Sequence, residues 1–235
     1  MFLVTGDIHG LRDRQDFERL SFVYQDLFDI MTKEDYLIIT GDFGLVWDSS
    51  VEEIRLLQWL EDRNFTTLFV DGNHENFDLL ELLYPVENWN GGRIRRISPS
   101  VMQLMRGQIY EIDGKSFFTM GGAESHDKEF RIPGISWWQQ ELPTRQEIQE
   151  ARANLLGHRM QVDYVITHCL PSSVQRQLFG DDNAIYPDNI LTDFLDEIAA
   201  KIQYKYWYCG HYHRDGVVIT NPKMNIIYQK VKLLG

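Results

Sequence analysis

The chain has 235 residues, of which 43% are apolar and 25% are charged, and its formal net charge is −12. This length and composition are ordinary for a globular protein, so we expect one domain over residues 1–235. The acidic balance argues against bulk nucleic-acid binding, which depends on Lys and Arg neutralising phosphates. The sequence has no run of about twenty apolar residues, so we expect no membrane span.

The start of the sequence and the two cysteines favour a cytoplasmic protein. Residues 1–7 lack the basic start and apolar run of a secretory signal. Cys169 and Cys209 are too few for a disulfide framework, and each lies beside a histidine-containing motif. We therefore expect a reducing, cytoplasmic setting in which both cysteines are small buried hydrophobic residues.

In its first half the sequence alternates strand and helix patterns. Short apolar runs predict three buried strands, at residues 2–5, 36–40 and 66–70. Helical spacing of apolar residues predicts helices over residues 13–31 and 51–63 and a short one that ends at Leu83, before Pro85.

From residue 90 onward the pattern changes to short strands joined by tight turns. The predicted strands are 93–97, 101–105, 108–112 and 116–120, with a hairpin turn at Asp113-Gly114. A loop is expected over 121–143, then a helix over 144–158 with Thr144 as N-cap and Glu147 completing a capping box. The last third is predicted as strand-then-loop units, with strands at 164–167, 204–209, 217–220 and 225–231. This order predicts an α/β (α+β) sandwich of mixed β-sheets flanked by helices.

Five polar clusters each follow directly on a predicted strand: Asp7-Ile8-His9, Gly41-Asp42, Gly72-Asn73-His74-Glu75, His168, and Gly210-His211-Tyr212-His213. Functional groups of α/β proteins gather at the carboxyl ends of strands. Glycines before four of the clusters permit a close approach of the backbone. The spacing of two in Asp7-X-His9 and His211-X-His213 predicts that both side chains of each pair share one face.

The chemistry of these clusters predicts a metal site. Carboxylates, imidazoles and one amide oxygen suit Mn, Fe, Zn or Ni, and the thiolates of a structural zinc site are missing from them. A Gly-Asp pair after a strand is by itself common turn chemistry. Coincidence is a poor explanation of five such clusters that all follow strands. Seven ligands are more than one ion needs, so we expect two ions.

Together these motifs resemble the ordered motif set of the calcineurin-like metallophosphoesterases, from residue 5 to residue 213. The resemblance implies a four-layer αββα sandwich of two mixed β-sheets around a dinuclear centre. It implies that one ion is held by Asp7, His9 and His213, the other by Asn73, His168 and His211, and that Asp42 bridges them. It also implies that a metal-bridging hydroxide attacks phosphorus, while His74 protonates the leaving oxygen or stabilises the transition state.

The sequence departs from that family pattern after Asp42. Leu45 stands where the family commonly has an Asp that orients the catalytic histidine, and Val46 where protein phosphatases have a phosphate-binding Arg. The partner of His74 therefore stays open among Asp48, Asp71 and Glu75. Loss of a bidentate Arg weakens the case for a protein phosphatase and leaves diesters more open.

The predicted loop over residues 121–143 offers further candidates for substrate contact. His126 and Arg131 are polar candidates, and Trp137 or Trp138 offers a ring for stacking on an aromatic leaving group. Packing of both tryptophans against the body of the protein is the simpler interpretation.

Arg93, Arg95 and Arg96 form the densest basic cluster, and alternation places Arg93 and Arg95 on one face. An anion site is one interpretation, and an edge strand guarded by charge is the simpler one.

The sequence therefore predicts a cytoplasmic, metal-dependent phosphoester hydrolase with two divalent ions, manganese first, and no organic cofactor. We expect a phosphodiesterase or general phosphatase acting on a small or nucleotide-like substrate. The alternatives are a dinucleoside polyphosphate hydrolase, a Ser/Thr protein phosphatase, or a non-catalytic protein-binding scaffold of the same fold. The filled ligand positions favour the enzyme, and only Leu45 favours the scaffold. The natural substrate, the physiological metal and the oligomeric state stay open.

Overall fold

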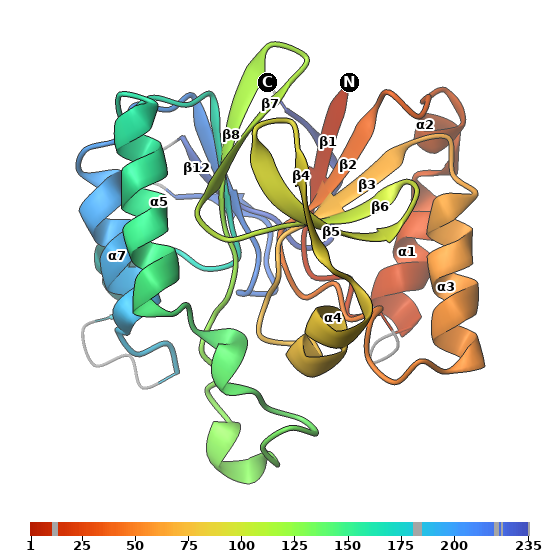
Figure 1. The fold of residues 1–235 in the computed structure, drawn as a ribbon, viewed down its shortest axis with the longest axis horizontal. Helices are drawn as coiled ribbons and strands as arrows, with labels where there is room; N and C mark the ends of the chain where they lie inside the picture. Colours follow the sequence, from red (N-terminus) through yellow and green to blue (C-terminus); the bar gives the residue numbers. More distant parts are fainter. Residues whose placement is uncertain (11–13, 181–184, 219–220, 222, 235) are drawn as a thin grey trace.

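A computed structural model describes residues 1–10, 14–180, 185–218, 221 and 223–234. Two mixed β-sheets lie face to face between two layers of helices (Figure 1). The first sheet has the strand order β13 (Lys232–Leu233), β1 (Phe2–Thr5), β2 (Tyr36–Ile39), β3 (Thr66–Phe69), β6 (Val101–Leu104), β5 (Gly92–Ser98) and β4 (Val86–Trp89). The second has the order β11 (Gly216–Val217), β12 (Met224–Ile226), β10 (Tyr206–Cys209), β9 (Tyr164–Thr167), β8 (Lys115–Met120) and β7 (Gln108–Ile112). This arrangement confirms the predicted α/β sandwich.

Apolar alternation along the strands builds the layers. In β1, Phe2 and Val4 face the second sheet, whereas Leu3 faces the helices that cover the first sheet. That outer face is covered by α1 (Arg14–Val23), α2 (Gln25–Asp29), α3 (Val51–Glu61) and α4 (Phe77–Leu83). The second sheet is covered by α5 (Arg145–Gly157), α6 (Ser172–Phe179) and α7 (Ile190–Ala199). Because β1 and β2 are covered on both faces, the residues that point to either face are mostly apolar. In the described part of the chain, no helix is both long and apolar enough to cross a bilayer.

The strands that precede the polar motifs are parallel within each sheet. In the first sheet β1, β2 and β3 run parallel, and in the second β9 and β10 run parallel. Each of these strands ends one to four residues before a motif, at Thr5, Ile39, Phe69, Thr167 and Cys209. The residues from 121 to 143 project from this same end of the sandwich (Figure 1).

The predicted turn and cap are confirmed. Asp113 and Gly114 have φ values of 50° and 69°, the left-handed pair that a two-residue hairpin requires, and they join β7 to β8. Thr144 accepts a hydrogen bond from the Glu147 N–H, and the Glu147 side chain accepts one from the Thr144 N–H. This capping box starts α5 where the sequence predicts.

Several element predictions were wrong in extent or missed an element. The helix expected over 13–31 is broken at Tyr24, whose φ of −112° and ψ of 15° lie outside the helix, and its start at residue 13 lies outside the described residues. The strand expected over 225–231 ends at Ile226, and a separate strand of the other sheet, β13, begins at Lys232. The end of the strand expected over 217–220 also lies outside the described residues. The last third contains α6 and α7 and not only strands and loops.

The arginine cluster of β5 does not guard an edge. Strand β4, which the sequence analysis missed, pairs with β5 and forms the edge itself. Arg93 pairs with Glu150, Arg96 pairs with Glu87, and the Arg95 guanidinium donates to the Tyr84 carbonyl. The interpretation as an edge strand was therefore wrong, and these three side chains have intramolecular partners.

A buried ion pair fixes the loop after β8 to the end of β3. The Arg106 guanidinium donates to the Asp71 carboxylate over 2.8 Å from Nε, and both side chains are almost fully buried. The same guanidinium donates to the carbonyl oxygen of Gln140. Asp71 directly precedes the Gly72-Asn73-His74 motif, so this pair holds that motif against the segment over 121–143.

We expect Arg106→Leu to lower the free energy of unfolding by about 3–5 kcal/mol, because it leaves Asp71 as an unpaired buried charge. The matched control is Arg93→Leu, which breaks a pair whose side chains are 40% and 34% exposed and is expected to cost less than about 1 kcal/mol. Urea denaturation of both variants measures the difference. Equal costs for the two variants would contradict this account of Arg106.

Candidate metal centre

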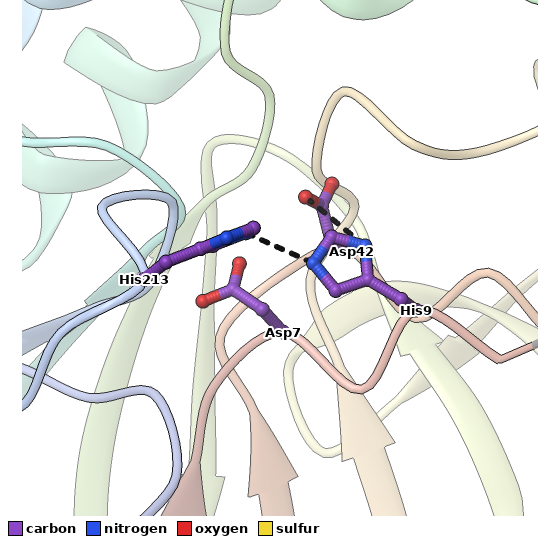
Figure 2. A group of neighbouring side chains, drawn as sticks. All are labelled: Asp7, His9, Asp42 and His213. Carbon is purple, nitrogen blue, oxygen red and sulfur yellow. Dashed lines mark hydrogen bonds and ion pairs between the residues drawn. The ribbon is translucent and has the colours of Figure 1, made fainter. Parts of the chain in front are cut away.

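Four of the seven predicted ligands converge from loops that follow β1, β2 and β10. Each of Asp7, His9, Asp42 and His213 offers one ligand atom within 4.8 Å of the other three. Figure 2 shows these side chains pointing toward one another. The Nε2 atoms of His9 and His213 are 3.0 Å apart, and His9 Nδ1 lies 3.9 Å from Asp42 Oδ2. The cluster brings together two carboxylates and two imidazoles, a set that could hold a metal ion.

The other three predicted ligands lie on the opposite side of Asp42. His168 Nε2 is 3.3 Å from Asp42 Oδ1 and 3.2 Å from Asn73 Oδ1. The ring of His211 packs edge-on against the ring of His168, with centroids 4.9 Å apart. Asp42 therefore turns one carboxylate oxygen toward His9 and the other toward His168. The structure brings all seven residues to one place.

The tautomer of His168 tests whether these residues fit a metal ion. Its Nδ1 lies 2.8 Å from the carbonyl oxygen of Thr40, which can only accept, so Nδ1 carries the proton. In the neutral ring, Nε2 then presents a lone pair to the oxygens of Asp42 and Asn73. Three electron-pair donors that face one another in a buried place are the arrangement that a cation satisfies.

The pKa shifts of the residues at the centre also favour a bound cation. Burial would raise the pKa of Asp42, yet the nearby His168 and His74 hold it well below its usual range. Burial would lower the pKa of His168, yet Asp42 and Asp7 raise it to about 9. For His211, burial and then the neighbouring His168 lower the pKa well below its usual value, which leaves the neutral imidazole that binds metals. The centre thus stabilises a positive charge beside Asp42.

Strained backbone, not β alternation, aims the histidines. His9, Asp42, His211 and His213 have φ values of 50°, 50°, 71° and 46°. The prediction that a spacing of two turns each pair to one face assumed extended backbone. That premise was wrong, because His9, His211 and His213 have left-handed conformations. Each such residue costs on the order of 1 kcal/mol, and strain of this kind concentrates at functional sites.

Two glycines make room for the ligands. A Cβ atom at Gly41 would lie 2.1 Å from His168 Nδ1, and one at Gly72 would lie 2.0 Å from Asp42 Oδ1. Both distances are far below van der Waals contact. The expectation that glycines beside the motifs permit a close approach is confirmed at these positions.

The three carboxylates considered as partners of His74 have other hydrogen-bond donors. Asp71 receives the Arg106 guanidinium, and Asp48 Oδ1 accepts the Ser50 N–H ahead of α3. Glu75 is buried and accepts backbone N–H groups, including that of Phe43 at 2.8 Å. Burial, and next the charge of Asp42, raise the pKa of Glu75 to about 8.

The His74 ring packs edge-on against the His9 ring, with centroids 5.3 Å apart, and it also meets the loop over 121–143. Arg131 Nη1 lies 3.4 Å from His74 Nδ1, and the His74 backbone N–H donates to Asp42 Oδ1 over 2.8 Å. Arg131, named in the sequence only as a candidate for substrate contact, therefore lies at the centre. His126, the other polar candidate, lies with its ring 6.4 Å from that of Tyr186.

The same loop supports Asn73 through two residues that the sequence analysis missed. Asn73 Nδ2 donates to Ser125 Oγ over 3.2 Å, which directs Asn73 Oδ1 toward His168. The Ser125 N–H in turn donates to the buried carboxylate of Glu141 over 2.9 Å. Asn73 and Ser125 are 52 residues apart, and no local pattern in the sequence links them.

Trp138 and both cysteines are buried in the body of the protein, as the simpler interpretation of each predicted, whereas Trp137 is not fully buried. Trp138 is buried and donates from Nε1 to Asp78 over 2.9 Å, so it packs the loop onto α4, whereas Trp137 is half-buried. Cys169 and Cys209 are free and buried, as predicted. Burial raises the pKa of the Cys169 thiol to about 12, so the thiol stays protonated.

Comparison with known proteins identifies the family. A model of the calcineurin-like phosphoesterases matches residues 1–215. Among solved structures, the phosphopantetheinyl hydrolase PptH from Mycobacterium tuberculosis is 16% identical with a TM-score of 0.45, over 97% of this chain and 89% of that one. The sulfate thiohydrolase SoxB from Thermus thermophilus, in complex with glycerol, is 12% identical with a TM-score of 0.41, over 97% of this chain and 51% of that one. A search of curated proteins gave no significant match.

The two-sheet sandwich and the cluster of carboxylates and imidazoles define a metal-dependent hydrolase. The chain belongs to the calcineurin-like phosphoesterase family, whose members bind divalent metals and hydrolyse phosphoesters.

Glu141, which supports Asn73 through Ser125, makes the stability of the protein depend on pH. Burial raises the pKa of Glu141 from about 4.5 in an unfolded chain to about 7. Because the folded state holds the proton more tightly, its contribution to stability is complete below about pH 4.5 and is lost as the pH rises through about 7. Glu141→Gln keeps an oxygen for the Ser125 N–H and carries no charge. We therefore expect the melting temperature of the variant, minus that of the parent, to increase between about pH 5 and pH 8. A difference that does not change over this range would contradict the assignment.

Proposed function

We propose that the chain is a dinuclear metallophosphoesterase, with manganese as the first choice of metal, that cleaves a small or nucleotide-like phosphoester. Asp7, His9 and His213 would hold one ion, Asn73, His168 and His211 the other, and Asp42 would bridge them. The observation that carries this proposal is the position of Asp42, whose two carboxylate oxygens face different groups of ligands. The buried, free cysteines support a reducing, cytoplasmic setting.

The residues of the chain have distinct tasks in this proposal. When bound, the ions supply Lewis acidity and lower the pKa of water. The Thr40 carbonyl holds His168 in the tautomer that presents Nε2, and Ser125 turns the Asn73 amide oxygen inward. The His74 backbone N–H donates to Asp42, which places the imidazole at the edge of the centre, where it would protonate the leaving oxygen or stabilise its charge.

The residues after Asp42 support a phosphodiesterase or general phosphatase over a protein phosphatase. Leu45 and Val46 are fully buried and pack in the core under the first sheet. Because residue 46 is a valine, this position offers no guanidinium to a bound phosphate. Protein phosphatases would have a phosphate-binding Arg at this position, and this chain lacks it.

The metal content tests the proposal first. We expect the purified chain to bind two divalent ions at saturation and to hydrolyse chromogenic phosphoesters with Mn²⁺ added. Asp42→Ala should lose metal and nearly all activity, because it removes the carboxylate shared by both half-sites. Asp62→Ala, at an exposed position after α3, is the matched control and should behave as the parent. One ion per chain, or full activity in Asp42→Ala, would refute the dinuclear centre.

The role of His74 is tested separately. His74→Asn should keep its metal, because His74 is not among the proposed ligands, and should lower kcat by a factor of about 10²–10⁴. His158→Asn, at the exposed C-terminal end of α5, serves as the control and should leave kcat unchanged. Parent-like turnover in His74→Asn would remove His74 from the mechanism.

A further inference from the structure

Arg131 is held at the metal centre by contacts within its own loop. Its side chain is only 10% exposed, and its Nη2 forms an ion pair with Asp127 Oδ1 over 2.6 Å. Its neighbours in sequence point the other way, since Phe130 is 82% exposed and Ile132 is 59% exposed. A long cationic side chain between two exposed apolar residues would ordinarily extend into water. Here it turns inward, toward His74.

The position of the guanidinium relates it to the proposed reaction. Nη1 lies 3.4 Å from His74 Nδ1 and 3.4 Å from the Ser136 carbonyl oxygen. His74 follows Asn73 in sequence, and its backbone N–H donates to Asp42. A phosphate close enough to meet the His74 ring is therefore also close to the Arg131 guanidinium.

We propose that Arg131 binds the phosphate of the substrate and makes the site selective for dianionic phosphomonoesters. This inference rests on the proposed function and names its substrate class. A guanidinium presents a fork of N–H donors that matches phosphate oxygens, and its contribution grows with the charge of the phosphate. Asp127 fixes the plane of the group by holding Nη2. The loop over 121–143 thus supplies the cation that position 46 lacks.

The consequence for substrate choice differs from the one drawn from Val46 alone. With no guanidinium beside the metals at the phosphate, the site would distinguish monoesters from diesters less strongly. A fixed guanidinium strengthens the binding of two negative charges more than one, so the phosphomonoester is favoured.

The test compares one phosphomonoester with one phosphodiester, both carrying a 4-nitrophenyl leaving group, under a single Mn²⁺ concentration. We expect Arg131→Ala to lower kcat/KM for the monoester by about 10- to 100-fold and to weaken inhibition by inorganic phosphate similarly, as for the loss of charge-assisted hydrogen bonds. The diester should lose much less. Arg131→Lys, which keeps the charge without the planar fork, should fall between Arg131→Ala and the parent.

The controls separate this inference from folding and from the proposed function. Lys128→Ala removes a cation from the same loop, 51% exposed and paired with Glu124, and should leave the monoester-to-diester ratio unchanged. The ratio within one variant does not depend on how much of the protein is folded, so a loss of stability cannot imitate the effect. A ratio in Arg131→Ala equal to that of the parent, with two ions still bound, overturns the role of Arg131 and leaves the dinuclear hydrolase standing. A parent protein that binds fewer than two ions overturns the proposed function itself.

Discussion

The position of Asp42 is the constraint on which the rest of the centre depends. Its carboxylate is buried and lies between two groups of electron-pair donors, which come from loops of two different sheets. A buried carboxylate is costly unless positive charge compensates it. The imidazoles of His168 and His74 supply part of that compensation and hold the pKa of Asp42 low. Divalent ions would supply the rest, and the left-handed conformations of His9 and His213 are reasonable only if the ligand geometry repays their strain.

Much of the fold and most of the candidate ligands could be predicted from the sequence, because short stretches of neighbouring residues determine them. A short apolar run followed at once by Gly-Asp or Gly-Asn-His marks the end of a buried strand, and the carboxyl ends of parallel strands share one edge. The candidate ligands therefore follow from their position along the chain, directly after the strands. The hairpin at Asp113-Gly114 and the capping box at Thr144 are equally local, and both are confirmed.

The errors arose where the determining contacts are distant in sequence or a local signal was overlooked. The break at Tyr24 accompanies a hydrogen bond from the Val231 N–H to the Tyr24 hydroxyl, which no local pattern predicts. Helix α7 had a local signal, since Asn189 caps it and Leu191, Phe194, Leu195 and Ile198 follow at helical spacing. Strand β4 is short and largely exposed, so it lacks an apolar pattern. The contact between Arg131 and His74 joins residues 57 apart and appears only in three dimensions.

The loop over residues 121–143 completes the centre in ways that the motifs alone do not. Ser125 supports the Asn73 amide, Glu141 supports Ser125, and Arg106 ties the loop to Asp71. The motifs thus predict which atoms would hold the metals, whereas under our proposal the loop would supply the group that meets a bound phosphate. In this proposal, reaction class and substrate choice would be carried by different parts of the fold, since a loop can change without the ligand set changing.

The most direct test of the central claim is a crystal structure of the Mn²⁺-loaded protein, with anomalous diffraction used to place the metal. The account predicts two anomalous peaks about 3.5–4 Å apart with the Asp42 carboxylate between them. A single peak, or two peaks of which neither contacts Asp42, would contradict it.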